Sequence, residues 1–163
     1  MSSSDAGSDR GLKYWVIVWA PVLAMITAIA IESTSWLGSD HTSGPLRTAW
    51  EFIFGRVSDA AWPAIHHTLR KTGHFVGYGL LGLTWLRAWR MTLAAGSFLR
   101  DALLAMAGTV LVASADEWHQ TYLPNRTGRW QDVALDSSGA VVLLAGVWVV
   151  AQFRAHRRLP HAV

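Results

Sequence analysis

The sequence predicts an all-α integral membrane protein, a four-helix bundle with short interfacial helices in its first outer loop. The chain of 163 residues is 52% hydrophobic and only 15% charged, with a mean hydropathy of +0.24. This composition is too apolar for an ordinary soluble domain. A helix needs roughly 20 largely apolar residues to cross a bilayer. Four stretches close to that length run over about residues 14–31, 74–89, 102–120 and 133–153.

Each of the four stretches has identifiable ends. The first follows a polar, serine-rich segment and leads into Glu32 without a small-x-small cleavage pattern, so we expect a retained helix rather than a signal peptide. The second starts at His74 and the third ends near Gln120. The fourth begins just after Asp132 and contains Asp136. We therefore expect a disordered cytoplasmic tail, a transmembrane domain and a basic cytoplasmic tail, over residues 1–12, 13–155 and 156–163.

The long first loop, residues 36–70, carries signals for short helices. Gly44 followed by Pro45 suits a helix start, and Pro63 suits the start of a second helix. One helical face in this loop is apolar and consists of Leu46, Trp50, Ile53 and Phe54. We expect these helices to lie on the outer membrane interface.

The charged residues favour an orientation with both termini in the cytoplasm. The short second loop and the C-terminal segment, which weigh most in setting topology, then carry the inner arginines Arg87, Arg90, Arg100, Arg154, Arg157 and Arg158. Most acids fall on the outer side, namely Glu32, Asp40, Glu51, Asp59, Asp116, Glu117, Asp132 and Asp136. Because acids do not set topology, this asymmetry indicates a polar site at the outer face.

Composition excludes several classes of protein. The chain has no cysteine, so disulfides and thiolate metal sites are ruled out. Its net charge of +3 does not indicate nucleic acid binding, because the basic residues are scattered at helix ends instead of forming a stripe. No nucleotide-binding glycine pattern or nucleophile elbow is present.

The polar residues recur at helical spacing near the predicted outer ends. Lys71, His74 and Tyr78 are three and four residues apart, so they share a helix face. Gln120 follows Asp116 by four residues and Glu117 by three. The remaining members of this polar cluster are Arg70, Arg126, Arg129, Asp132 and Asp136. Asp132 and Asp136 share a face of the fourth helix, and Gly139-Ala140 continues that face with small residues that permit close helix contact.

Two interpretations of the polar cluster are open at this point. Ionisable groups at membrane depth are costly, so they normally pair inside the bundle, and the cluster can be a structural staple. Alternatively, adjacent carboxylates can serve as general acid or base. A divalent cation would relieve the electrostatic repulsion between these two carboxylates, and its suitable ligands are His74, Asp116, Glu117 and His119.

Segments 70–78, 116–120, 124–126 and 132–140 closely resemble the VanZ-like family of small bacterial membrane proteins. The residues that match the family pattern are Lys71, His74, Phe75, Tyr78, Asp116, Glu117, Gln120, Arg126, Asp132, Asp136 and Gly139. Two positions depart from it: Asn125 stands where glycine is usual, and Asp136 takes the acidic alternative to asparagine. The resemblance implies a multi-pass protein of the bacterial cytoplasmic membrane. It also implies a link to the cell envelope and to antibiotic resistance, because a founding relative is linked to low-level teicoplanin resistance.

These observations leave two main functional hypotheses. In the first, an enzyme acts on a lipid-anchored envelope substrate, with His74, Asp116 and Glu117 as catalytic candidates. The residues that would bind the substrate are Arg70, Lys71, Tyr78, Gln120, Arg126, Arg129, Asp132 and Asp136. In the second, a non-catalytic factor uses the same pocket to bind a membrane lipid or an antibiotic tail. A transporter ranks third, because polar residues near one face provide little of a path across the membrane.

Overall fold

The computed structural model describes residues 11–34, 38–93, 96–123, 126 and 128–157, and these form helices without any strand. The helices are α1 (Leu12–Glu32), α2 (Ser39–Phe54), α3 (Trp62–Thr92), α4 (Phe98–Gln120) and α5 (Trp130–Arg157). The prediction of an all-α fold is therefore confirmed. Pro124 and Asn125 of segment 124–126, which carries part of the family resemblance, lie outside the described residues, as do most of the two expected tails.

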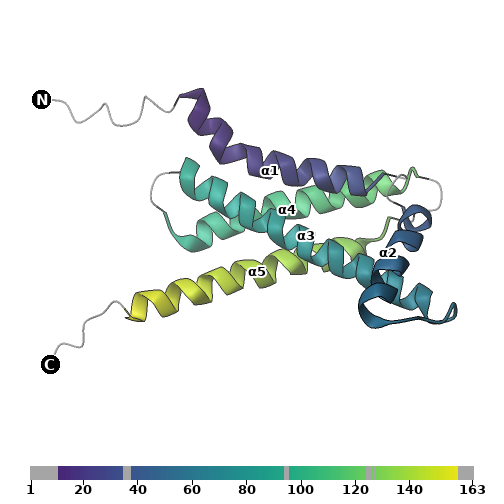
Figure 1. Cartoon of the computed structure of the whole chain (residues 1–163). Helices are drawn as coiled ribbons and strands as arrows, with labels where there is room; N and C mark the ends of the chain where they lie inside the picture. Colours follow the sequence, from purple (N-terminus) through teal and green to yellow (C-terminus); the bar gives the residue numbers. More distant parts are fainter. Residues whose placement is uncertain (1–10, 35–37, 94–95, 124–125, 127, 158–163) are drawn as a thin grey trace, which may run out of the picture.

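Helix α3 lies at the centre of the molecule. It contacts α1, α4 and α5, whereas α2 contacts only α3 among the described helices. Successive long helices run in opposite directions (Figure 1). As a result, the ends of α1 and α4 lie beside the starts of α3 and α5, and this arrangement brings the polar residues of four helices to one end of the bundle. We call this the polar end.

Three of the described helices are long and apolar enough to cross a membrane, namely α1, α4 and α5. Helix α3 has sufficient length, with 31 residues, but His74, Tyr78 and Arg87 interrupt its apolar run. Its central position accounts for this composition, because side chains that contact other helices do not have to dissolve in lipid. The chain is thus a helical membrane protein, and a fourth crossing by α3 stays a prediction.

Two helices start earlier than the sequence indicated. Helix α2 begins at Ser39 and contains Pro45 in its interior, so the expected start at Gly44-Pro45 is wrong. Pro45 lies beyond the first turn, where a proline removes one backbone hydrogen bond and strains the helix, yet α2 continues through it to Phe54. Helix α3 begins at Trp62 with Pro63 in its first turn, so the second helix expected in the loop is continuous with the span that was expected to begin at His74.

A network around Arg47 closes the segment between α2 and α3. The Arg47 guanidinium lies 3.0 Å from Glu51 Oε1 and 2.7 Å from Asp59 Oδ1, and it donates to the Val57 carbonyl oxygen at 2.8 Å. The Arg47 side chain, followed by the backbone N–H of Val57, holds the pKa of Glu51 below its ordinary value. Gly55, between them, has a φ of 88°, a conformation that favours glycine.

Helices α3 and α5 meet along small residues. A Cβ at Gly79 would lie 2.8 Å from Leu143 Cδ1, and a Cβ at Gly82 would lie 2.9 Å from Ala140 Cβ. At Gly139 a Cβ would overlap the carbonyl oxygen of Phe75. The expectation that Gly139-Ala140 permits close helix contact is confirmed. We call this contact the α3–α5 seam.

The other end of the bundle is aromatic. The Trp19 ring contacts Trp85 and Trp89 edge-to-face, with centroids 5.7 and 5.1 Å apart. Nearby, Pro21 lies inside α1 and has no N–H to donate to the Ile17 carbonyl. Arg87 of α3 donates to that oxygen at 3.2 Å, so a cation on one helix satisfies a group that proline leaves unpaired on another.

Candidate functional site

Asp116 is the centre of a hydrogen-bonded group between α3 and α4. Tyr78 Oη donates to Asp116 Oδ2 at 3.0 Å, and Gln120 Nε2 donates to the same oxygen at 3.2 Å. All three residues are buried. Gln120 reaches Asp116 because residues four apart share a helix face, and the antiparallel packing of α3 supplies Tyr78. No hydrogen bond from a described residue reaches Oδ1, so this oxygen is the free acceptor of the carboxylate.

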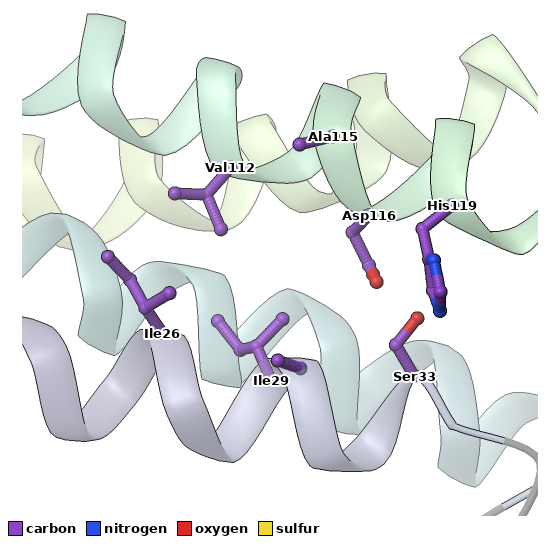
Figure 2. A pocket seen from close by; sticks show the side chains of 8 residues that line it. Ile26, Ile29, Ser33, Val112, Ala115, Asp116 and His119 are labelled. Atoms are coloured by element: carbon purple, nitrogen blue, oxygen red, sulfur yellow. The ribbon is translucent and has the colours of Figure 1, made fainter.

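An apolar groove of about 330 Å³ runs between α1 and α4 and ends at Asp116. Its walls are Ile26, Ile29 and Ala30 of α1 and Val112 and Ala115 of α4. Figure 2 shows these side chains facing one another across the gap between the two helices. Helices α1 and α4 make few direct contacts along their length, which leaves the space for the groove.

Three polar side chains converge at one end of the groove. Ser33, Asp116 and His119 lie together there, with the Ser33 hydroxyl pointing toward the other two (Figure 2). Ser33 is 3% exposed, and its hydroxyl has no hydrogen-bond partner among the described residues. A buried hydroxyl without a partner is energetically costly unless a ligand or water satisfies it. Ser33 was not predicted, because a single serine after an apolar helix carries no sequence signal.

Glu117 faces a different part of the molecule from Asp116. Its Oε2 accepts the backbone N–H of Arg129 at 2.7 Å, so it ties the end of α4 to the start of α5. Adjacent residues of a helix do not face each other, and the two carboxylates accordingly have separate partners. Glu117 is therefore a connection between helices in this structure and does not line the groove.

His74 and Lys71 each face a carboxylate of α5. His74 Nδ1 lies 3.6 Å from Asp136 Oδ2, beyond hydrogen-bond length. Asp136 is completely buried, and neither of its oxygens has a hydrogen-bond partner among the described residues. Lys71 Nζ lies 2.5 Å from Asp132 Oδ1 at the half-exposed rim. Both pairs staple α3 to α5, away from the groove.

The arginines of the cluster also lie apart from the groove. Arg126 Nη2 donates to the carbonyl oxygen of Glu32 at 3.5 Å, and the Arg129 side chain is exposed. Neither these two nor Arg70 is among the described residues that line the groove. Lys71 instead lines a second pocket of about 340 Å³ with Phe75 of α3 and Leu135 of α5. The polar residues thus gather at one end of the bundle but divide between two sides of α3.

A metal site is not formed by the side chains as they are placed. Among the described residues, no group of three or more His, Asp or Glu is arranged to hold a metal ion. His74, Asp116, Glu117 and His119, the ligand set considered from the sequence, have the contacts given above and do not form a common centre. We therefore assign no chemistry to a cation.

The fold and the polar end together define a class: a small helical membrane protein with an apolar groove that ends at a hydrogen-bonded carboxylate. The chain matches the model of the VanZ/LLP1 family over residues 14–152. It belongs to the VanZ/LLP1 family, as the motifs in the sequence indicated. No curated protein and no solved structure matches the chain significantly.

Proposed function

We propose that this chain binds a lipid-anchored molecule of the bacterial cell envelope in the groove between α1 and α4. One observation carries the proposal: an apolar channel between two membrane helices ends at the Asp116 carboxylate, one oxygen of which accepts no hydrogen bond from a described residue. Such a shape suits an amphipathic molecule, with its chain against Ile29 and Val112 and its head at Asp116. Ala30 and Ala115 are exposed, so the groove opens at the helix surface, where a lipid can enter from the bilayer.

The proposal includes the location of the site. We place the polar end at the outer face of the cytoplasmic membrane, with α3 as a fourth crossing and both termini inside, on the basis of the arginines at the opposite helix ends. Helix α2 then lies at the outer interface. Phe52, Ile53 and Phe54 are 91%, 67% and 67% exposed at its end, which supports contact with the headgroup region.

Binding is favoured over catalysis by the positions of the catalytic candidates. His74 and Glu117 face α5, and only Asp116 of the three lines the groove. A general acid or base must lie within hydrogen-bond reach of the substrate, and two of the three candidates do not. Teicoplanin tolerance is then a proposed consequence of binding, either of an envelope lipid or of the acyl chain of the antibiotic.

Mass spectrometry of co-purified lipids tests the proposal. Ala30→Phe places a ring in the groove, whereas Ala28→Phe places the same ring on an exposed position of α1 outside it. We expect the wild type and Ala28→Phe to retain a specific lipid, and Ala30→Phe to lose it at an unchanged melting temperature. In cells, any tolerance to teicoplanin should be lost with Ala30→Phe alone.

Equal lipid recovery from all three proteins would contradict binding in the groove. Chemical conversion of the retained lipid by the purified wild type would favour the enzymatic alternative instead. That activity should then disappear with Asp116→Asn, because the isostere cannot transfer a proton in the same way.

A further inference from the structure

We infer that the head group recognised at the end of the groove carries hydrogen-bond donors, as an ammonium or a hydroxyl group does, and that a phosphate is rejected there. The inference rests on the proposed function, because it names the chemistry of the molecule that the groove binds. It differs from the expectation from the sequence that Lys71, Arg126 and Arg129 help to bind the substrate.

The first support is the orientation of Asp116. Both donors within the protein, Tyr78 Oη and Gln120 Nε2, reach the same oxygen, at 3.0 and 3.2 Å. These bonds hold the carboxylate in one orientation and leave Oδ1 without a hydrogen bond from a described residue. An ammonium or hydroxyl hydrogen would complete the coordination of Oδ1, and a bond of this kind is among the stronger ones in proteins because one partner is ionised.

The second support is the pair of polar groups beside Asp116. The Ser33 hydroxyl is buried, has no partner among the described residues and points toward Asp116 and His119 (Figure 2). A hydroxyl can accept one hydrogen bond while it donates another. A head with more than one donor can therefore reach the Ser33 oxygen and Asp116 Oδ1 together.

The third support is the charge of the walls. Among the eight described residues that line the groove, Asp116 is an acid and none is Lys or Arg. Arg126, which reaches the Glu32 carbonyl, lies outside that lining. An anionic head would thus meet the Asp116 carboxylate in a lining that contains no Lys or Arg and whose other polar residues are Ser33 and His119, and like charges in a weakly solvated site repel strongly. The groove selects by repulsion as well as by attraction.

Amphiphiles with one chain and four different heads test this inference. The protein is placed in nanodiscs of phosphatidylcholine, whose head has no N–H or O–H donor. Apparent affinities are obtained from melting temperature against the concentration of dodecylammonium, dodecyl glucoside, dodecyltrimethylammonium or dodecyl phosphate. We expect dodecylammonium to bind roughly tenfold or more tightly than dodecyltrimethylammonium, which has the same charge without a donor. Dodecyl glucoside should rank second and dodecyl phosphate last.

Two variants test the assignment to residues. Asp116→Asn should weaken dodecylammonium binding roughly tenfold or more, because the amide lacks the charge. Ser33→Ala removes a hydroxyl that makes no hydrogen bond to a described residue, so the unliganded protein should keep its melting temperature while dodecylammonium and dodecyl glucoside bind severalfold more weakly. Ser114→Ala, an exposed serine of α4 outside the groove lining, is the matched control. If Asp116→Asn does not fold, Ser33→Ala decides the assignment.

The outcomes separate this inference from the proposed function. Unchanged binding of all four amphiphiles by Ala30→Phe would overturn binding in the groove itself. Loss of all four with Ala30→Phe, together with dodecyl phosphate as the tightest ligand of the wild type, would overturn only the donor head. An unchanged ranking in Ser33→Ala and in a folded Asp116→Asn would also overturn it.

Discussion

The two sides of α3 differ in how closely the helices approach one another. On one side, the α3–α5 seam packs Gly79, Gly82 and Gly139 against backbone atoms and the side chains of Leu143 and Ala140, with no room for an added Cβ. On the other side, α1 and α4 touch sparsely and leave a groove of about 330 Å³ between them. The difference shows that the bundle combines a close-packed half, which fixes the polar end, with an open half that can accept a ligand.

The ionic contacts follow the same division. Across the α3–α5 seam, Lys71 forms an ion pair with Asp132. His74 faces the buried Asp136 at 3.6 Å without a hydrogen bond. On the groove side, Asp116 keeps one oxygen free and Ser33 has no partner among the described residues. Polar groups left unsatisfied where there is also space indicate binding, whereas paired ones indicate stability.

The largest expected effect is a break in the α3–α5 seam. Gly139→Ala should destabilise the protein by about 3 kcal/mol or prevent folding, because the new Cβ overlaps the Phe75 carbonyl oxygen and the helices must separate. Denaturant titration in detergent micelles measures this change in the free energy of unfolding. Gly146→Ala, on the same helix with nothing near its Cβ, should be neutral or stabilising by up to about 1 kcal/mol. Equal effects of the two variants would mean that the seam is not close-packed.

An intermediate effect is expected at Arg87. Arg87→Leu should cost about 1 to 3 kcal/mol, because the Ile17 carbonyl loses the donor that replaces the missing N–H of Pro21. In a Pro21→Ala background that carbonyl regains a helical donor, so the same substitution should cost clearly less. A double-mutant cycle of unfolding free energies measures the coupling. Additive effects would show that Arg87 does not compensate for Pro21.

The smallest effect concerns the segment closed by Arg47. The pKa of Glu51 is lowered, first by the Arg47 side chain, so its contribution to stability is present above the unfolded value of about 4.3. It is lost as pH falls through the lower folded value. The difference in melting temperature between wild type and Glu51→Gln should be small at neutral pH and vanish in acid. In an Arg47→Gln background this pH dependence should be clearly smaller, with only the Val57 N–H contribution left. An undiminished pH dependence there would exclude the ion pair as its main cause.

The sequence predicted the all-α fold and the gathering of polar residues at one end, but it missed the starts of α2 and α3 and did not reveal the groove. Helical spacing correctly placed Gln120 beside Asp116, and small residues correctly indicated the contact at Gly139. Glu117 could not be assigned, because its partner is a backbone N–H, which no sequence pattern specifies. Ser33 and the apolar walls were missed for a related reason: a groove depends on how far apart two helices are, and residue types alone do not determine that distance.

The double hydrogen bond to Asp116 has a consequence for how the family can diversify. Tyr78 and Gln120 belong to α3 and α4, so the acceptor is positioned without any contribution from α1. Under the proposed function, substitutions at Ile26, Ile29 or Ala30 would change the length or width of the chain that fits while the Asp116 acceptor stays in place. An α1 grafted from a relative up to Ile31, with Ser33 kept, would then change the preference for the tail and leave the preference for the head unchanged.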